Sequence, residues 1–150
     1  MIDVNVKIGA KLAQLGQTLS ELDANRLATL QASTLLAVMR TRIHVDGLAS
    51  DGQPIGIYSP AYLKRRAKAG RGTDPKVILS LTRTMENSWT LIPQGNGSVG
   101  IGFQNPAQAQ KAQWMEEIYD KEIFQPTIEE KQLLENIREG FVKKIIEQAK

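Results

Sequence analysis

The residues that could carry out acid–base chemistry are few. The chain of 150 residues has a single histidine, His44, and no cysteine. His44 precedes Val45-Asp46, so an imidazole and a carboxylate are close in sequence and could form half of a proton-transfer pair. A plainer position is the end of a helix, where the dipole favours a protonated imidazole. The lack of cysteine excludes disulfides, thiolate metal sites and cysteine nucleophiles, and one histidine excludes multi-histidine zinc sites.

Carboxylates gather in one short stretch that could bind a divalent cation. Glu116 and Glu117 are adjacent, and Asp120 and Glu122 follow. Consecutive carboxylates on a helix point in different directions, so a solvated acidic face is the favoured interpretation. Neither a dinucleotide-binding GxGxxG motif nor a P-loop is present. We therefore expect no enzymatic activity, no metal and no cofactor.

Residues 64–76 are the one local feature with a functional interpretation. They hold one acid, Asp74, and six cations: Lys64, Arg65, Arg66, Lys68, Arg71 and Lys76. Residues 116–150 carry an excess of acids, so the chain, with a net charge of +3, is electrically bipolar. The basic segment could be a solvated surface loop, a contact for an acidic protein surface, or a contact for DNA phosphates. Its small, polar composition predicts a mobile loop, and no DNA-binding motif accompanies it.

Helices are predicted at both ends of the chain. Apolar residues recur in steps of three and four over residues 8–22, and a second series out of phase with the first runs from Leu27 to Ile43. The pattern predicts either one long kinked helix or two helices with a break near residues 23–25. The first stripe either packs against the domain's own sheet or pairs with a neighbouring subunit. Thr127 and Glu130 form a capping box that predicts the last helix.

The middle of the chain is mixed. Turn residues punctuate residues 44–57, and Ser59-Pro60 predicts the start of a short helix. From Val77 onward, apolar residues spaced by three and four up to Trp89 predict another helix.

A β-hairpin is predicted next, with strands at 89–92 and 98–103 around Gly95-Asn96-Gly97. A helix over 106–119 and an extended piece at 123–126 follow. The predicted fold is a single α+β domain. Its small antiparallel hairpin is packed by a long N-terminal helical region and by C-terminal helices.

Composition sets the broad class. Hydrophobic residues make up 41% and charged residues 23% of the chain, as in ordinary globular domains. No apolar run approaches the roughly 18–20 residues that span a bilayer, and the first residues lack the pattern of a signal peptide. We expect a cytoplasmic-type protein without a membrane partner.

The ordered set of segments resembles bacteriophage neck proteins of the tail-completion and virion-morphogenesis families. The matching segments, spread over most of the chain, are residues 38–43, 51–54, 58–63, 78–89, 100–103, 112–117 and 123–126. Two departures stand out. The family often has a glycine after the Leu-Thr pair, where this chain has Arg83, and a glycine after the acidic stretch, near Asp120.

The resemblance implies a structural, non-enzymatic virion protein of the head–tail junction, assembled in the host cytoplasm. Such proteins form rings or cap the tail tube. The implied partners are copies of the chain itself and other neck, portal, adaptor or tail-tube proteins. The basic segment could also line a channel and contact passing DNA non-specifically. The alternative is a small nucleic-acid-binding regulatory protein that uses the same basic segment.

Overall fold

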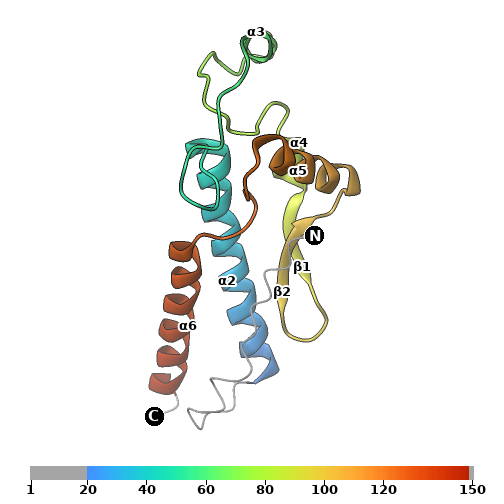
Figure 1. Ribbon diagram of the computed structural model, residues 1–150. Coiled ribbons are helices and arrows are strands. Elements are labelled where there is room, and N and C mark those ends of the chain that lie inside the picture. The colour runs from blue at the N-terminus through green and yellow to red at the C-terminus, as the bar shows by residue number, and fades with distance from the viewer. Residues whose placement is uncertain (1–19, 149–150) are drawn as a thin grey trace. The chain divides into compact units, whose positions relative to one another are not determined.

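A computed structural model describes residues 20–148 and has the predicted α+β class (Figure 1). The described part contains five α-helices, one π-helical turn and one two-stranded sheet. In chain order the elements are α2 (Glu21–Thr41), η1 (Arg42–Asp46), α3 (Pro60–Lys68), α4 (Thr84–Ser88), β1 (Trp89–Pro93), β2 (Val99–Phe103), α5 (Pro106–Tyr119) and α6 (Ile128–Gln148).

Helix α2 starts at a side-chain cap. The Ser20 hydroxyl accepts a hydrogen bond from the Asp23 backbone N–H at 3.2 Å, which satisfies an otherwise unpaired amide of the first turn. Residues 23–25 lie inside α2, so of the two predicted alternatives the pair of helices with a break there is not found. The other alternative, one long kinked helix, extends beyond the described residues. The apolar series from Leu27 is confirmed, with Leu27 and Ile43 among its fully buried side chains. The stripe predicted over residues 8–22 falls almost wholly outside the described residues.

The chain folds into two compact units. Within the described residues, the first unit holds the chain up to Val38, Thr90–Gly102 and the chain from Ile128 onward. In this unit α2 and α6 are joined by the Gln31 amide, whose Nε2 donates to the Leu134 carbonyl at 2.7 Å. The prediction of a single domain stays a prediction.

The hairpin in this unit is confirmed. Strands β1 and β2 pair, and the Gln94 N–H donates to the Ser98 carbonyl at 3.1 Å beside the turn. Gly95 and Gly97 have φ values of +74° and +81°, which a glycine adopts without steric cost. The turn therefore lies where the two glycines predict it.

The second unit, Met39–Trp89 and Phe103–Thr127, has an aromatic centre. The Trp89 ring stacks on Phe103 with centroids 5.8 Å apart and meets the edge of Phe124 at 5.4 Å. The Arg42 guanidinium ties the surrounding loops together, because it donates to carbonyls of Ile123 and Gln125. Helix α5 agrees with the prediction, whereas residues 123–126 lie outside any helix but bend at Phe124 and Gln125 instead of running extended.

The helix predicted from Val77 to Trp89 is wrong over most of its length. Only Thr84–Ser88 is helical, as the short α4. The backbone of residues 78–81 is engaged instead by side chains from elsewhere in the unit, so it cannot form the helical ladder. Leu79 and Arg83 also have positive φ values, which interrupt a right-handed helix.

None of the helices within residues 20–148 has an apolar stretch long enough to cross a membrane.

Candidate functional site

Helix α3 is fixed by a cap at one end and a buried cation near the other. The Ser59 hydroxyl accepts from the Tyr62 N–H at 3.3 Å, and Pro60 occupies the first helical position, both as predicted. Arg66 is only 2% exposed. Its Nη1 donates to the Ser80 carbonyl at 2.6 Å, and its guanidinium lies 4.7 Å from the centre of the Tyr58 ring. Arg66 therefore anchors α3 to the unit and is not free to contact a partner.

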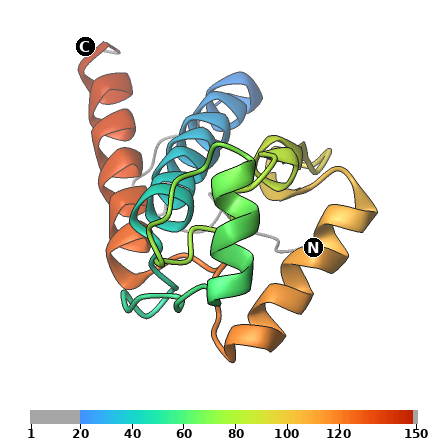
Figure 2. The ribbon, with the colours of Figure 1, turned by 90° about the horizontal axis from the view of Figure 1, so that it is seen from above.

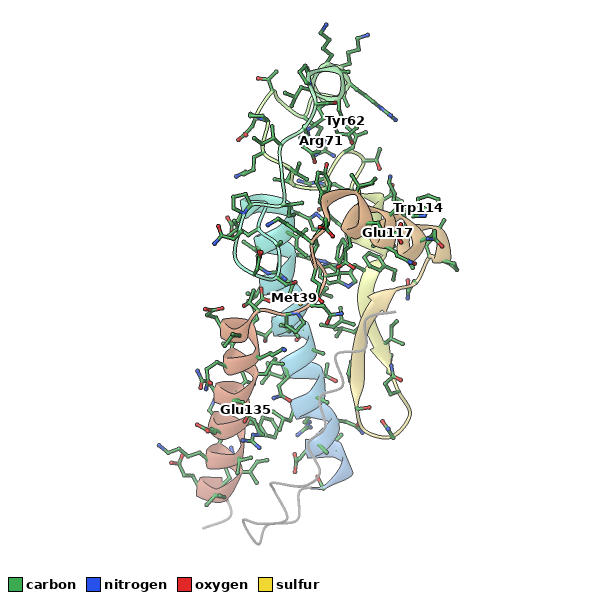
Figure 3. The ribbon with its side chains drawn as sticks, viewed as in Figure 1. Met39, Tyr62, Arg71, Trp114, Glu117 and Glu135 are labelled. Carbon is green, nitrogen blue, oxygen red and sulfur yellow. The ribbon has the colours of Figure 1, made fainter. Side chains whose placement is uncertain are left out.

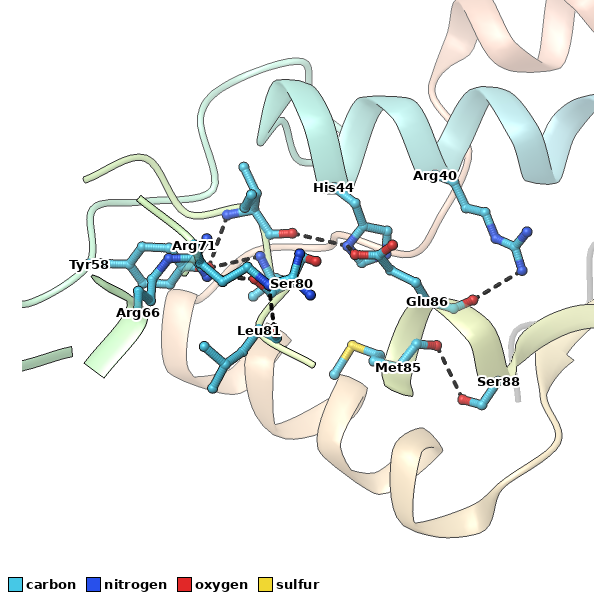
Figure 4. Close-up of polar contacts among 12 residues, drawn as sticks. Arg40, His44, Tyr58, Arg66, Arg71, Ser80, Leu81, Met85, Glu86 and Ser88 are labelled. Atoms are coloured by element: carbon cyan, nitrogen blue, oxygen red, sulfur yellow. Dashed lines mark hydrogen bonds and ion pairs between the residues drawn. The ribbon is translucent and has the colours of Figure 1, made fainter. Parts of the chain in front are cut away.

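Residues 78–81 are held by side chains from elsewhere in the unit (Figure 4). The Tyr58 hydroxyl accepts from the N–H groups of Ile78 and Leu79 at 3.1 and 2.9 Å. Arg71 Nε donates to the Leu81 carbonyl at 2.6 Å. Burial raises the pKa of Tyr58, which keeps its phenol protonated at neutral pH. This network sets the course of residues 78–81.

The six predicted contact residues thus divide into two groups. Arg66 and the half-buried Arg71 hold backbone carbonyls. The exposed group contains Lys64, Arg65, Lys68 and Lys76. The exposed cations can meet an acidic surface, and three of them lie on α3 rather than on a loop. The mobility predicted for residues 64–76 stays a prediction.

An apolar groove of about 500 Å³ is lined by residues of α3, residues 79–85 and α5. Figure 2 gives the ribbons of α3 (green) and α5 (orange) from above. Its apolar lining comes from Ile57, Tyr62, Leu79, Leu81, Met85, Met115 and Ile118. Ile57 is 77% and Ile118 is 67% exposed. Large apolar side chains left in water around a hollow are typical of a protein-binding surface. The cations Arg65, Arg83 and Lys111 also line this groove.

The apolar surface continues along α5 beyond the groove. Trp114, marked on α5 in Figure 3, is 53% exposed. It lies four residues before Ile118, so the two side chains share one helix face. Aromatic residues are enriched at the centres of protein interfaces. The sequence analysis missed this surface. A usable signal was the position of Trp114 among polar and charged residues of the helix predicted over 106–119.

The acidic cluster has a structural role. Glu116 Oε1 accepts from the N–H groups of Ile123 and Phe124 at 2.8 and 3.0 Å, which ties the start of residues 123–126 to α5. Among the residues that the structure describes, no group of three or more candidate ligand side chains could hold a metal ion. The carboxylates singled out from the sequence are therefore not brought together as a cation site.

His44 lies in the last turn of η1, so the predicted position near a helix end is confirmed, but the protonated imidazole expected there is disfavoured because the ring is buried. Its Nδ1 lies 3.0 Å from the Ile78 carbonyl, so this nitrogen carries the proton and donates. The carboxylate beside it belongs to Glu86, 3.7 Å away, and not to the exposed Asp46 that the sequence suggested. Burial lowers the pKa of His44, more strongly than Glu86 raises it.

Three residues other than glycine have positive φ values within the described chain: Leu79, Arg83 and Asp120. Arg83, at φ +62°, immediately precedes α4. Asp120, at φ +50°, ends α5, and its N–H donates to carbonyls of the last turn. This left-handed conformation favours glycine, because a side chain crowds the following carbonyl.

Comparison with protein-family models, with characterised proteins and with solved structures found no match for this chain. The case for its function therefore comes from its own residues. What they form is an apolar groove with cations in its lining, which is a surface suited to binding.

Proposed function

We propose that this chain is a structural protein of a bacteriophage head–tail junction that forms or joins an oligomeric ring. The observation that carries the proposal is the backbone conformation at Arg83 and Asp120. Both stand at or near places where the resembled family has glycine, and both adopt the left-handed conformation that glycine favours. Similarity in residue order alone does not require this agreement, so it is independent support.

The groove supplies a surface for such assembly. Its exposed isoleucines, Ile57 and Ile118, would lose contact with water against a partner. Cations in its lining would face the acidic residues that prevail in positions 116–150 of another copy. A basic face meeting an acidic face is a heterologous contact, and heterologous contacts close into rings when the rotation permits.

Native mass spectrometry over a range of protein concentrations tests the proposal, with the chain alone and mixed with neck partners from the same phage. We expect a discrete ring in at least one of these conditions. Ile118→Asp should weaken assembly, because it places a charge in the groove. Ile128→Asp is the matched control, since Ile128 is 82% exposed and does not line the groove.

Two results would count against the proposal. One is a strict monomer in every condition at high concentration. The other is equal loss of assembly in the Ile118 and Ile128 variants, which would place the interface elsewhere.

The alternative, a nucleic-acid-binding regulator, would depend on the four exposed cations of the basic segment. Gel-shift titrations at low and moderate salt distinguish the two functions. A preference for one DNA sequence above about a thousandfold favours the regulator. Weak binding that is independent of sequence and lost with salt agrees with a channel-lining role.

A further inference from the structure

A second pocket, of about 380 Å³, lies within the same unit and is lined by an excess of cations. Its charged and titratable lining residues are Arg40, His44, Arg66, Arg71, Arg83 and Glu86. They come from α2, η1, α3 and α4, from the loop after α3 (Arg71) and from the loop before α4 (Arg83). Four guanidinium groups therefore share the pocket with one carboxylate.

The guanidinium groups lack counter-charges. None of the four forms an ion pair within residues 20–148. The one carboxylate, Glu86, lies 3.7 Å from the ring of His44, whose pKa burial lowers, so the pocket still holds four guanidinium charges against one carboxylate. Arg66 is nearly fully buried, yet its contacts are only a carbonyl and a phenol. Burying a guanidinium without an anion is costly, because it cannot lose its charge and has left its hydration shell. The pocket thus holds more positive charge than its own residues balance.

The arginines are also only partly used as donors. Arg40 donates through Nη2 to carbonyls of Glu86 and Trp89. Arg71 donates through Nε to the Leu81 carbonyl, and both Arg71 and Leu81 are labelled in Figure 4. In the described part of the chain the terminal nitrogens of Arg71, and every side-chain nitrogen of Arg83, make no hydrogen bond. The backbone contacts fix the guanidinium groups of Arg40 and Arg71 through one nitrogen each, while other donor groups remain for a ligand.

We propose that this pocket binds a phosphate-type oxyanion, with Arg71 and Arg83 as the principal donors. A guanidinium presents paired N–H groups that match phosphate oxygens. Arginines that arrive from separate segments suit a tetrahedral anion, whose oxygens point in several directions, better than a planar carboxylate, which one guanidinium satisfies. The pocket has room for a phosphate ester as well as for the free ion. Its source is therefore either inorganic phosphate or the backbone of a nucleic acid.

Isothermal titration calorimetry with inorganic phosphate, in chloride buffer at constant ionic strength, tests this inference on the full chain. We expect saturable binding that weakens about tenfold in Arg83→Gln, which removes an exposed guanidinium and leaves a polar, uncharged side chain. Lys68→Gln is the matched control, because it removes the same charge from an exposed position that does not line the pocket. That control should bind phosphate as the unmodified chain does.

A second variant keeps the inference open to refutation if one substitution is too mild. Arg71→Gln together with Arg83→Gln should abolish the phosphate heat, with circular dichroism confirming that the protein is folded. Equal phosphate binding in all variants would overturn the proposal. So would a phosphate titration that releases no more heat than a control titration with chloride. Binding of an acidic peptide without binding of phosphate would overturn it too, since the site would then recognise carboxylates.

A competition experiment distinguishes the two sources of phosphate, a nucleic-acid backbone and a small phosphate compound. A short DNA duplex that displaces inorganic phosphate, and loses affinity in Arg83→Gln, identifies the nucleic-acid backbone as the ligand. Phosphate that stays bound in the presence of excess duplex identifies a small phosphate compound. Both results support an oxyanion site, and neither depends on ring assembly.

Discussion

Replacing Arg83 by glycine should stabilise the protein relative to replacing it by alanine. Arg83 has φ +62° and ψ +6°. An L-residue in this left-handed conformation costs about 1–2 kcal/mol, whereas glycine adopts it freely but loses about 0.5–1 kcal/mol more conformational entropy on folding. The difference favours Arg83→Gly over Arg83→Ala by about 1 kcal/mol. Both variants remove the guanidinium, so changes in charge cancel in the comparison.

The same pair of substitutions at Gln110 is the matched control. Gln110 is exposed within α5, where alanine is the better helix former by about 1 kcal/mol. The sign of the glycine–alanine difference should therefore reverse between the two positions. Asp120, at φ +50°, should behave as Arg83 does.

Urea unfolding followed by circular dichroism measures these differences, with linear extrapolation to water. For a chain of this size, 1 kcal/mol corresponds to a shift in Tm of about 2–4 °C. If Arg83→Ala is as stable as Arg83→Gly or more so, Arg83 is not left-handed. This position then no longer corresponds in conformation to the glycine of the phage family.

Three further results are expected. Burial lowers the pKa of the His44 imidazole below its usual 6.5, so as the pH falls the imidazole is protonated in the unfolded chain before it is protonated in the folded one. The free energy of unfolding should therefore fall as the pH drops below about 6.5. His44→Asn should remove this pH dependence, measured by urea unfolding. Arg66→Met should destabilise by about 2 kcal/mol in the same assay, because it leaves the Ser80 carbonyl without its donor, and an unchanged midpoint would contradict this anchoring role. Gly47→Ala should lower Tm more than Gly70→Ala: both have positive φ values, but only at Gly47 would a Cβ meet a backbone carbonyl at 2.5 Å.

The elements that the sequence predicted well are those whose signals are local. The Ser59-Pro60 pair fixes the start of α3 through one hydroxyl and one ring, and both act within a single turn. The glycines of the hairpin act within two residues of the turn. Such signals need no knowledge of what lies elsewhere in the fold.

The segment from Val77 to Arg83 was predicted wrongly because its hydrogen-bond partners are distant in sequence. Apolar spacing of three and four suits a helix, but the Tyr58 hydroxyl and the Arg66 guanidinium claim the backbone groups that a helix would use. Only the tertiary structure brings these donors and acceptors together.

The basic segment shows the same limit at the site. Arg65 and Arg66 are neighbours of identical type, yet one is exposed and the other buried. The groove was not predicted at all, because α3, the 79–85 segment and α5 contribute to it separately. A linear pattern of charge cannot distinguish a cation that anchors a helix from one that faces solvent.

The side-chain anchoring of residues 78–81 has a consequence for how this protein can diversify. Tyr58, Arg66 and Arg71 contact main-chain atoms of residues 78–81. The path of this backbone therefore depends on those three side chains rather than on the side chains of residues 78–81. Leu79 and Leu81, which line the groove, can therefore be exchanged while the hydrogen bonds persist. Saturation mutagenesis should find substitutions tolerated at Leu81 and rejected at Tyr58 and Arg66. Related proteins could therefore differ in the partner that the groove binds while keeping the same backbone path.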